Sequence, residues 1–219
     1  MRKNMTHLTL LSCAFLLVTV FAAPSEAAIG RNVVEEAWKR IAAAAAMDPI
    51  PITYENDKSP NAWVKFQSSK NFSVHVTEGL MQVLNSPDEI AGILGHEMGH
   101  VKLGHYNKGV QRNVGWSILG SLLGKAGGVA EIAGAVGMNL AESGFSREQE
   151  VDADDYGADL AIKAGYNPWG LYRAMKSFKD NGFKTTPSGF NSHPPTDRRL
   201  QRLEERAKKA EAAQSVKNR

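Results

Sequence analysis

The stretch His96-Glu97-Met98-Gly99-His100 decides how this chain of 219 residues is interpreted. Two histidines four positions apart on a helix differ by about 40° around its axis, so both rings point into one space. That geometry suits two ligands of a single zinc ion, with Glu97 placed to act on a metal-bound water. The alternative is a chance match between two ordinary helix-surface histidines, and a third ligand elsewhere in the chain would decide between the two interpretations.

The residues around the motif predict a helix independently. Ser86 precedes Pro87 and two acids, with Glu89 at the capping-box position, and Gly104 is a stop signal. Apolar residues at helical spacing predict a buried stripe made of Ile90, Leu94, Met98 and Val101. The stripe leaves the two histidines at its edge, facing a cleft. Glycines at positions 92, 95 and 99 indicate that this helix packs closely against another backbone.

The rest of the chain predicts an α+β fold that is mostly helical. Helical patterns cover residues 32–46, 77–84, 146–164 and 167–182, and Thr196 caps a final charged helix. Strand patterns cover residues 50–55, 63–66 and 72–76, which are enough for a small sheet with an exposed edge. His75 falls on the polar face of the last strand, so it is not expected to bind metal.

The N-terminus has the layout of a secretory signal peptide. Arg2 and Lys3 precede an apolar run, and Ala27 ends a small-x-small cleavage site. We therefore predict a signal peptide at residues 1–27 and a single domain at residues 28–219. An uncleaved membrane anchor facing the periplasm is the alternative.

Cysteine content and charge narrow the class of protein further. Cys13 is the only cysteine, so the mature chain has neither a disulfide framework nor a catalytic thiol. An exported, cysteine-free domain indicates the periplasm of a bacterium. Loss of Arg2, Lys3 and Glu26 lowers the net charge from +3 to +2, which argues against a nucleic-acid partner.

The segment 114–140 is apolar but interrupted by glycines. Each apolar piece is too short to span a bilayer, so the segment predicts two closely packed helices. Peripheral membrane contact through residues 114–140 remains an open alternative.

The third zinc ligand must come from outside the motif. His105 would lie about 180° around the axis from His96 if the helix continued, so we interpret it as a helix-end histidine facing the C-terminal dipole. Glu150 and Asp154 are four residues apart and border the packed side of the helix that starts at Ser146. Other acids of this helix turn towards solvent, namely Asp152, Asp155 and Asp159. The alternative is a merely solvated acidic face.

The two separated motifs together resemble the M48 family of zinc metallopeptidases, in its periplasmic single-domain form. The resemblance covers the whole mature chain and includes Asn61-Ala62-Trp63, residues 164–168, and His193-Pro194 followed by Arg199. It implies a zincin-like domain that holds one zinc ion per chain. The ligands that it implies are His96, His100 and Glu150.

The resemblance also implies roles for three further residues. Glu97 would be the general base and acid, and Asp154 would orient a ligand histidine. His193 would either steady the oxyanion or occupy the open zinc position in a resting state. Residues 65–71 replace a Pro-Gly-Gly turn found in many family members, which affects the expected substrate preference rather than the chemistry.

The predicted function is a zinc metalloendopeptidase that cleaves unfolded or misfolded proteins of the cell envelope. Substrate is expected to bind extended, as an added strand at the sheet edge near residues 63–66. The alternative is a binding or chaperone module on a peptidase fold, with low or latent proteolytic activity. The sequence leaves the oligomeric state open.

Overall fold

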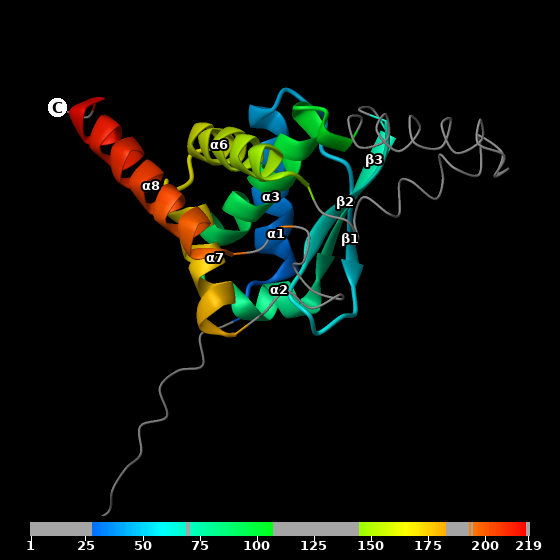
Figure 1. The fold of residues 1–219 in the computed structure, drawn as a ribbon. Helices are drawn as coiled ribbons and strands as arrows, with labels where there is room; N and C mark the ends of the chain where they lie inside the picture. Colours follow the sequence, from blue (N-terminus) through cyan, green and yellow to red (C-terminus); the bar gives the residue numbers. More distant parts are fainter. Residues whose placement is uncertain (1–27, 69–70, 107–144, 183–192, 194, 218–219) are drawn as a thin grey trace, which may run out of the picture.

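The fold is described by a computed structural model for residues 28–68, 71–106, 145–182, 193 and 195–217. It is mostly helical with one small sheet, as the sequence predicted (Figure 1). The helices are α1 (Arg31–Ala44), α2 (Glu78–Val83), α3 (Pro87–Lys102), α6 (Arg147–Lys163), α7 (Gly170–Asp180) and α8 (Asp197–Lys217). The strands are β1 (Ile52–Glu55), β2 (Ala62–Ser68) and β3 (Asn71–Thr77).

Helix α3, which carries the histidine motif, runs through the centre of the molecule and contacts α1, α6, α7 and β2. The predicted cap forms, because the Ser86 side chain accepts a hydrogen bond from the Glu89 amide. Every residue from Glu89 to Val101 is buried. The two histidines were expected at the edge of an apolar stripe facing a cleft, and this expectation was wrong. They are as buried as the stripe, because neighbouring elements cover α3 on all sides.

The sheet has the strand order β1-β3-β2, so β2 lies at an edge. β1 pairs parallel with β3, and β2 pairs antiparallel with β3. Val74 and Val76 face the core, whereas His75 lies on the other face, where its ring stacks on Trp63 and contacts Glu55. His75 therefore lies on the face of the sheet opposite the core, as the strand pattern predicted.

Small residues set the distance between α3 and its partner helices. A Cβ atom at Gly95 would lie 2.5 Å from the Gly157 carbonyl oxygen of α6, and one at Gly99 would lie 2.8 Å from the Ala153 carbonyl oxygen. On another side of α3, a Cβ atom at Gly92 would lie 2.5 Å from the Leu171 amide of α7. The predicted close backbone packing is confirmed, and it brings α6 against the motif.

Helix α6 begins at the predicted position, with a capping box formed by Ser146 and Gln149. It ends before Gly165, whose φ of +85° places it in the left-handed region that favours glycine. Helix α8 follows Thr196, whose side chain accepts a hydrogen bond from the Arg199 amide. Figure 1 shows α8 leaving the body of the molecule at an angle, with the C-terminus at its far end.

Two predicted segments lie outside the described residues: the signal peptide at 1–27 and the glycine-interrupted stretch at 114–140. None of the helices in the described part of the chain is both long and apolar enough to cross a bilayer.

Candidate metal centre

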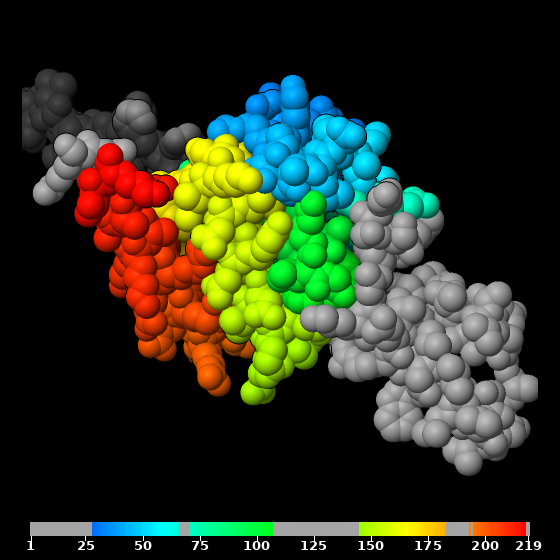
Figure 2. Space-filling model, turned by 90° about the horizontal axis from the view of Figure 1, so that it is seen from above, coloured from blue at the N-terminus to red at the C-terminus, as the bar shows by residue number. Residues whose placement is uncertain are grey.

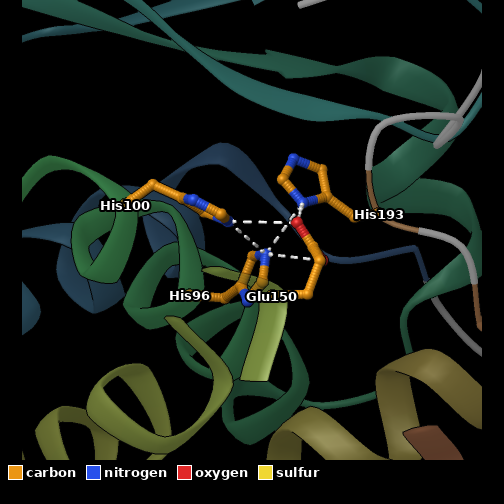
Figure 3. A group of neighbouring side chains, drawn as sticks. All are labelled: His96, His100, Glu150 and His193. Atoms are coloured by element: carbon orange, nitrogen blue, oxygen red, sulfur yellow. Dashed lines mark hydrogen bonds and ion pairs between the residues drawn. The ribbon is translucent and has the colours of Figure 1, made fainter. Parts of the chain in front are cut away.

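Four buried side chains converge in the middle of the fold: His96, His100, Glu150 and His193 (Figure 3). One ligand atom from each lies within 4.8 Å of the ligand atoms of the others. The first two come from α3 and Glu150 comes from α6, while His193 reaches in from the chain that precedes α8. Three parts of the chain far apart in sequence therefore meet at one point.

The atoms that face one another are three imidazole nitrogens and a carboxylate oxygen. His96 Nε2 lies 3.1 Å from His100 Nε2 and 3.0 Å from His193 Nδ1. Glu150 Oε1 lies 2.7 Å from His193 Nδ1 and 3.4 Å from His100 Nε2. Glu150 Oε2 lies 3.7 Å from His96 Nε2 and 3.2 Å from Arg199 Nη1.

The outer nitrogens of the two motif histidines show why this cluster fits a cation. His96 Nδ1 lies 2.9 Å from the Asp154 carboxylate, which can only accept, so the hydrogen of a neutral His96 is on Nδ1. Burial lowers the pKa of His100 well below its usual range, so this ring is neutral. The inner Nε2 atoms of the two rings lie 3.1 Å apart, so a cation between them would receive a lone pair from each ring.

Charged residues from two helices surround His96 on its outer side. Asp154 is fully buried and accepts hydrogen bonds from Arg199 Nε at 3.0 Å and Arg199 Nη2 at 2.7 Å. Arg202 of α8 donates a further bond of 2.7 Å to Asp154 Oδ2. Arg199 also donates to the His193 carbonyl oxygen at 2.7 Å. The outer nitrogen of His96 is therefore held by an ionic network that extends into α8.

The outer side of His100 is different, because aromatic rings surround it. His100 Nδ1 lies 3.0 Å from His105 Nδ1, and the Phe145 ring stacks on His100 with centroids 3.8 Å apart. The interpretation of His105 as a helix-end histidine facing the dipole was wrong. Helix α3 ends at Lys102, and Gly104 at a φ of +67° reverses the chain, so the buried His105 ring returns towards the motif.

Glu97 lies beside the cluster without joining it. It is fully buried, and together with burial its carboxylate raises the pKa of the neighbouring Tyr106. His193 Nε2 is 3.7 Å from Glu97 Oε1. Burial raises the pKa of Glu97, and the nearby His193 and His96 only partly offset this effect. A carboxyl group with a raised pKa is suited to accept and return a proton.

The other carboxylates of the site are held in their ionised form. Burial opposes ionisation of Glu150, but His193 and the hydrogen bond to His100 outweigh burial and lower the Glu150 pKa. Burial likewise opposes ionisation of Asp154, and the charge of Arg199 with the hydrogen bond to His96 lowers the Asp154 pKa. Ionised carboxylates and neutral imidazoles are the forms that bind metal ions.

Comparison with known protein families identifies the class of this site. Residues 29–207 match the model of peptidase family M48. The chain belongs to family M48. In a member of this family, the buried group of three histidines and one glutamate indicates a bound metal ion.

Individual M48 relatives are similar over most of the chain. The metalloprotease LoiP of Escherichia coli K12 is 34% identical over 141 residues, which are 62% of this chain and 56% of LoiP. The metalloprotease YcaL of the same strain is 32% identical over 151 residues, which are 67% of this chain and 58% of YcaL. A protease HtpX homolog of Salinibacter ruber is 30% identical over 69% of this chain and 66% of its own length. The chain thus spans little more than half of LoiP and YcaL.

All six residues named from the sequence lie together in this M48 fold: His96, Glu97, His100, Glu150, Asp154 and His193. The exposed Asp152 and Asp159 lie apart from the cluster, as expected from their helix positions. Three neighbours of the site were missed, namely Phe145, Arg202 and the inward turn of His105. Helical spacing does not reveal them, because each reaches the site through a turn or from a different helix.

Proposed function

We propose that this protein is a zinc-dependent metalloendopeptidase. The observation that carries the proposal is the convergence of His96 Nε2 and His100 Nε2, 3.1 Å apart, beside the Glu150 carboxylate. Imidazole nitrogens with one carboxylate are a donor set that suits zinc, and three such ligands leave one position for water. We infer that His96, His100 and Glu150 hold the ion.

When bound, zinc supplies Lewis acidity and lowers the pKa of a bound water towards about 7. Residues of the chain transfer the proton and orient the ligands. Glu97 accepts a proton at its carboxylate and passes it to the leaving amine, a role supported by its raised pKa and by its place beside the cluster. Asp154 fixes the tautomer and the ring orientation of His96.

His193 has two candidate roles that its contacts allow. Its Nδ1 atom faces Glu150 and His96, which favours occupation of the open metal position in a resting state. Its Nε2 atom faces Glu97, which favours a role in steadying the oxyanion once substrate has displaced the ring. Burial disfavours the charged ring, but Glu150 and Glu97 outweigh burial and raise the pKa of His193.

We propose that substrates are unfolded or misfolded polypeptides of the cell envelope. Strand β2 lies at the sheet edge and contacts α3, so an added strand there would run close to the motif. Main-chain pairing of this kind requires an extended segment, which compact domains do not offer. Export by residues 1–27 would place the enzyme in the periplasm, and mass spectrometry of the mature N-terminus would distinguish cleavage from retention as an anchor.

The burial of His193 within the cluster also favours a second candidate function. A chain whose open metal position is blocked would bind extended polypeptides and turn them over slowly or not at all. A chelator-sensitive assay with unfolded casein separates the two functions, because a chaperone module would bind casein without cleaving it.

Two variants of the purified protein test the enzyme assignment. Glu97→Gln should keep about one zinc per chain and lose at least ~100-fold in casein cleavage, since proton transfer contributes about 10²–10⁴-fold. Glu150→Ala should lose the metal as well as the activity. Wild-type cleavage by Glu97→Gln, or a full complement of zinc in Glu150→Ala, would contradict the assignment. Exposed Asp152→Asn is a matched control that should change neither property.

A further inference from the structure

His105 faces the nitrogen of His100 that points away from the centre. The two Nδ1 atoms are 3.0 Å apart, and both side chains are buried, with relative exposures of 0% for His100 and 1% for His105. His100 Nε2, by contrast, points to His96 and Glu150. One nitrogen of His100 therefore points to the centre and the other points away from it. The outer nitrogen of His100 contacts His105, whereas the outer nitrogen of His96 contacts the Asp154 carboxylate.

The direction of the hydrogen bond between these rings follows from the proposed metal site, on which this inference rests. A nitrogen that binds a cation must offer a lone pair, so a neutral His100 carries its hydrogen on Nδ1. That hydrogen is then donated to His105 Nδ1, which must be unprotonated. His105 therefore carries its own hydrogen on Nε2. Neighbours that fix the tautomer of a ligand histidine in this way influence metal affinity.

The turn after α3 brings the His105 ring back against His100. Five positions after His100, a continued helix would place a side chain about 140° away around the axis. The helix instead stops at Lys102, and the positive φ of Gly104 redirects the chain, so His105 lies back against His100. A side chain with the left-handed conformation of Gly104 would be strained, which explains a glycine at this position.

Phe145 constrains the same imidazole from another direction. Its ring lies nearly parallel to His100, at 3.8 Å between centroids and 26° between planes. Stacking holds the plane of the ring, and a hydrogen bond at Nδ1 holds its rotation within that plane. The two contacts together fix the direction in which Nε2 points.

We propose that His105 is a positioning residue that sets the tautomer and orientation of His100, and thereby the affinity of the centre for its metal. An imidazole acceptor carries no charge, so it orients the ligand without adding a negative charge to the site. The Asp154 carboxylate on the other side of the centre does both.

Replacement of His105 by an apolar residue tests this role. His105→Leu should raise the zinc dissociation constant about 10–100-fold, the effect typical of losing such a neighbour. His105→Gln, whose amide oxygen can accept the same hydrogen bond, should restore affinity to within about threefold of wild type. The measurement is competition with a chromophoric chelator, and the visible spectrum of the Co²⁺ form should change for Leu and not for Gln. His75→Leu, on the outer face of the sheet, is the matched control and should leave both unchanged.

Several outcomes would overturn the proposal. A His105→Leu protein that binds zinc as tightly as wild type, with an unchanged Co²⁺ spectrum, would exclude the role. If Leu prevents folding, His105→Met supplies a flexible apolar side chain for the same comparison. Imidazole ¹⁵N spectra of the zinc form should show His105 with its hydrogen on Nε2, and a hydrogen on Nδ1 would refute the bond direction. A wild-type protein that binds no zinc would instead refute the proposed function.

Discussion

The two motif histidines lie one turn apart on α3, yet different kinds of contact hold their outer nitrogens. The outer nitrogen of His96 meets the buried Asp154 carboxylate, which in turn receives Arg199 and Arg202. The outer nitrogen of His100 meets the His105 ring, and its face meets Phe145. The His96 side is therefore ionic and depends on a distant helix, whereas the His100 side is made of aromatic rings and depends largely on the turn that follows the motif.

This difference has a consequence for stability as well as for metal binding. A buried ion pair leaves an uncompensated charge when one partner is removed, which costs far more than a lost neutral hydrogen bond. Loss of an anchor on the His96 side should therefore destabilise the whole fold. Loss of an anchor on the His100 side should mainly affect the metal.

Asp154→Asn should produce the largest effect. Arg199 would remain buried with only Glu150 as a close carboxylate, at 3.2 Å. We expect the free energy of unfolding of the metal-free protein to fall by about 3 kcal/mol, the lower end for a broken buried pair. Zinc affinity should fall about 100-fold. Denaturant unfolding and chelator competition measure the two quantities, with Asp152→Asn as the exposed control on the same helix. A metal-free Asp154→Asn protein as stable as wild type would remove the distinction between the two sides.

Gly157→Ala should come next, because it tests the interface that brings both sides together. The added Cβ would lie 2.5 Å from the Gly95 carbonyl carbon and from the His96 amide nitrogen. Overpacking of this kind costs about 1–3 kcal/mol, and displacement of α6 would move Glu150 and Asp154 away from α3.

The control for Gly157→Ala lies on another side of the same helix. A Cβ atom at Gly92 would collide equally closely with the Leu171 amide of α7. We expect Gly92→Ala to lower the thermal midpoint to a similar extent and to leave zinc affinity nearly unchanged. Equal losses of zinc affinity in both variants would mean that α3 responds as a rigid unit and that neither interface has a special role.

Acid should weaken the Asp154 anchor of the metal-free protein. The pKa of Asp154 is lowered in the fold, because Arg199 and His96 outweigh the opposing effect of burial. A lowered folded pKa stabilises the protein above the unfolded value, about 3.9 for Asp, and this contribution is lost as the pH falls below that value. Unfolding free energies measured from pH 6 to pH 3 should therefore decline, with a flatter decline in Asp154→Asn. Parallel curves for the two proteins would show that Asp154 contributes nothing to the acid sensitivity.

The sequence was a good guide wherever the determining contacts are local. Ser86 and Ser146 cap helices through bonds within one turn, and the spacing of the motif fixes which rings share a direction. Helix position also separated Asp154 from the exposed Asp152. These features depend on backbone periodicity, which is readable without knowledge of the tertiary structure.

The sequence was a poor guide where a turn or a distant helix decides the contact. His105 was interpreted as a helix-end histidine facing the C-terminal dipole, but the positive φ of Gly104 redirects the chain and the ring turns back towards the motif. Arg202 reaches Asp154 from α8, a helix whose pattern indicated mainly a charged surface. The burial of α3 on all sides from Glu89 to Val101 was missed as well, since an apolar stripe gives no information on how many neighbours cover the polar side.

Substitutions on α8 should give the smallest effects and mark where the ionic network ends. Arg202 lies at 2.7 Å from the buried Asp154, while Arg206 contacts Asp155 and Asp159, whose side chains are 48% and 76% exposed. Arg202→Gln should lower zinc affinity severalfold and cost about 1 kcal/mol of stability, because a bond to a buried carboxylate is lost.

Arg206→Gln should cost less than about 1 kcal/mol and leave zinc affinity unchanged, because exposed ion pairs are weak and screened by salt. Chelator competition at low and high salt compares the two variants. If the network acts as one unit along α8, both substitutions will lower zinc affinity to the same extent. If it ends at Asp154, only Arg202→Gln will do so, and the difference will persist at high salt because the Asp154 carboxylate is buried.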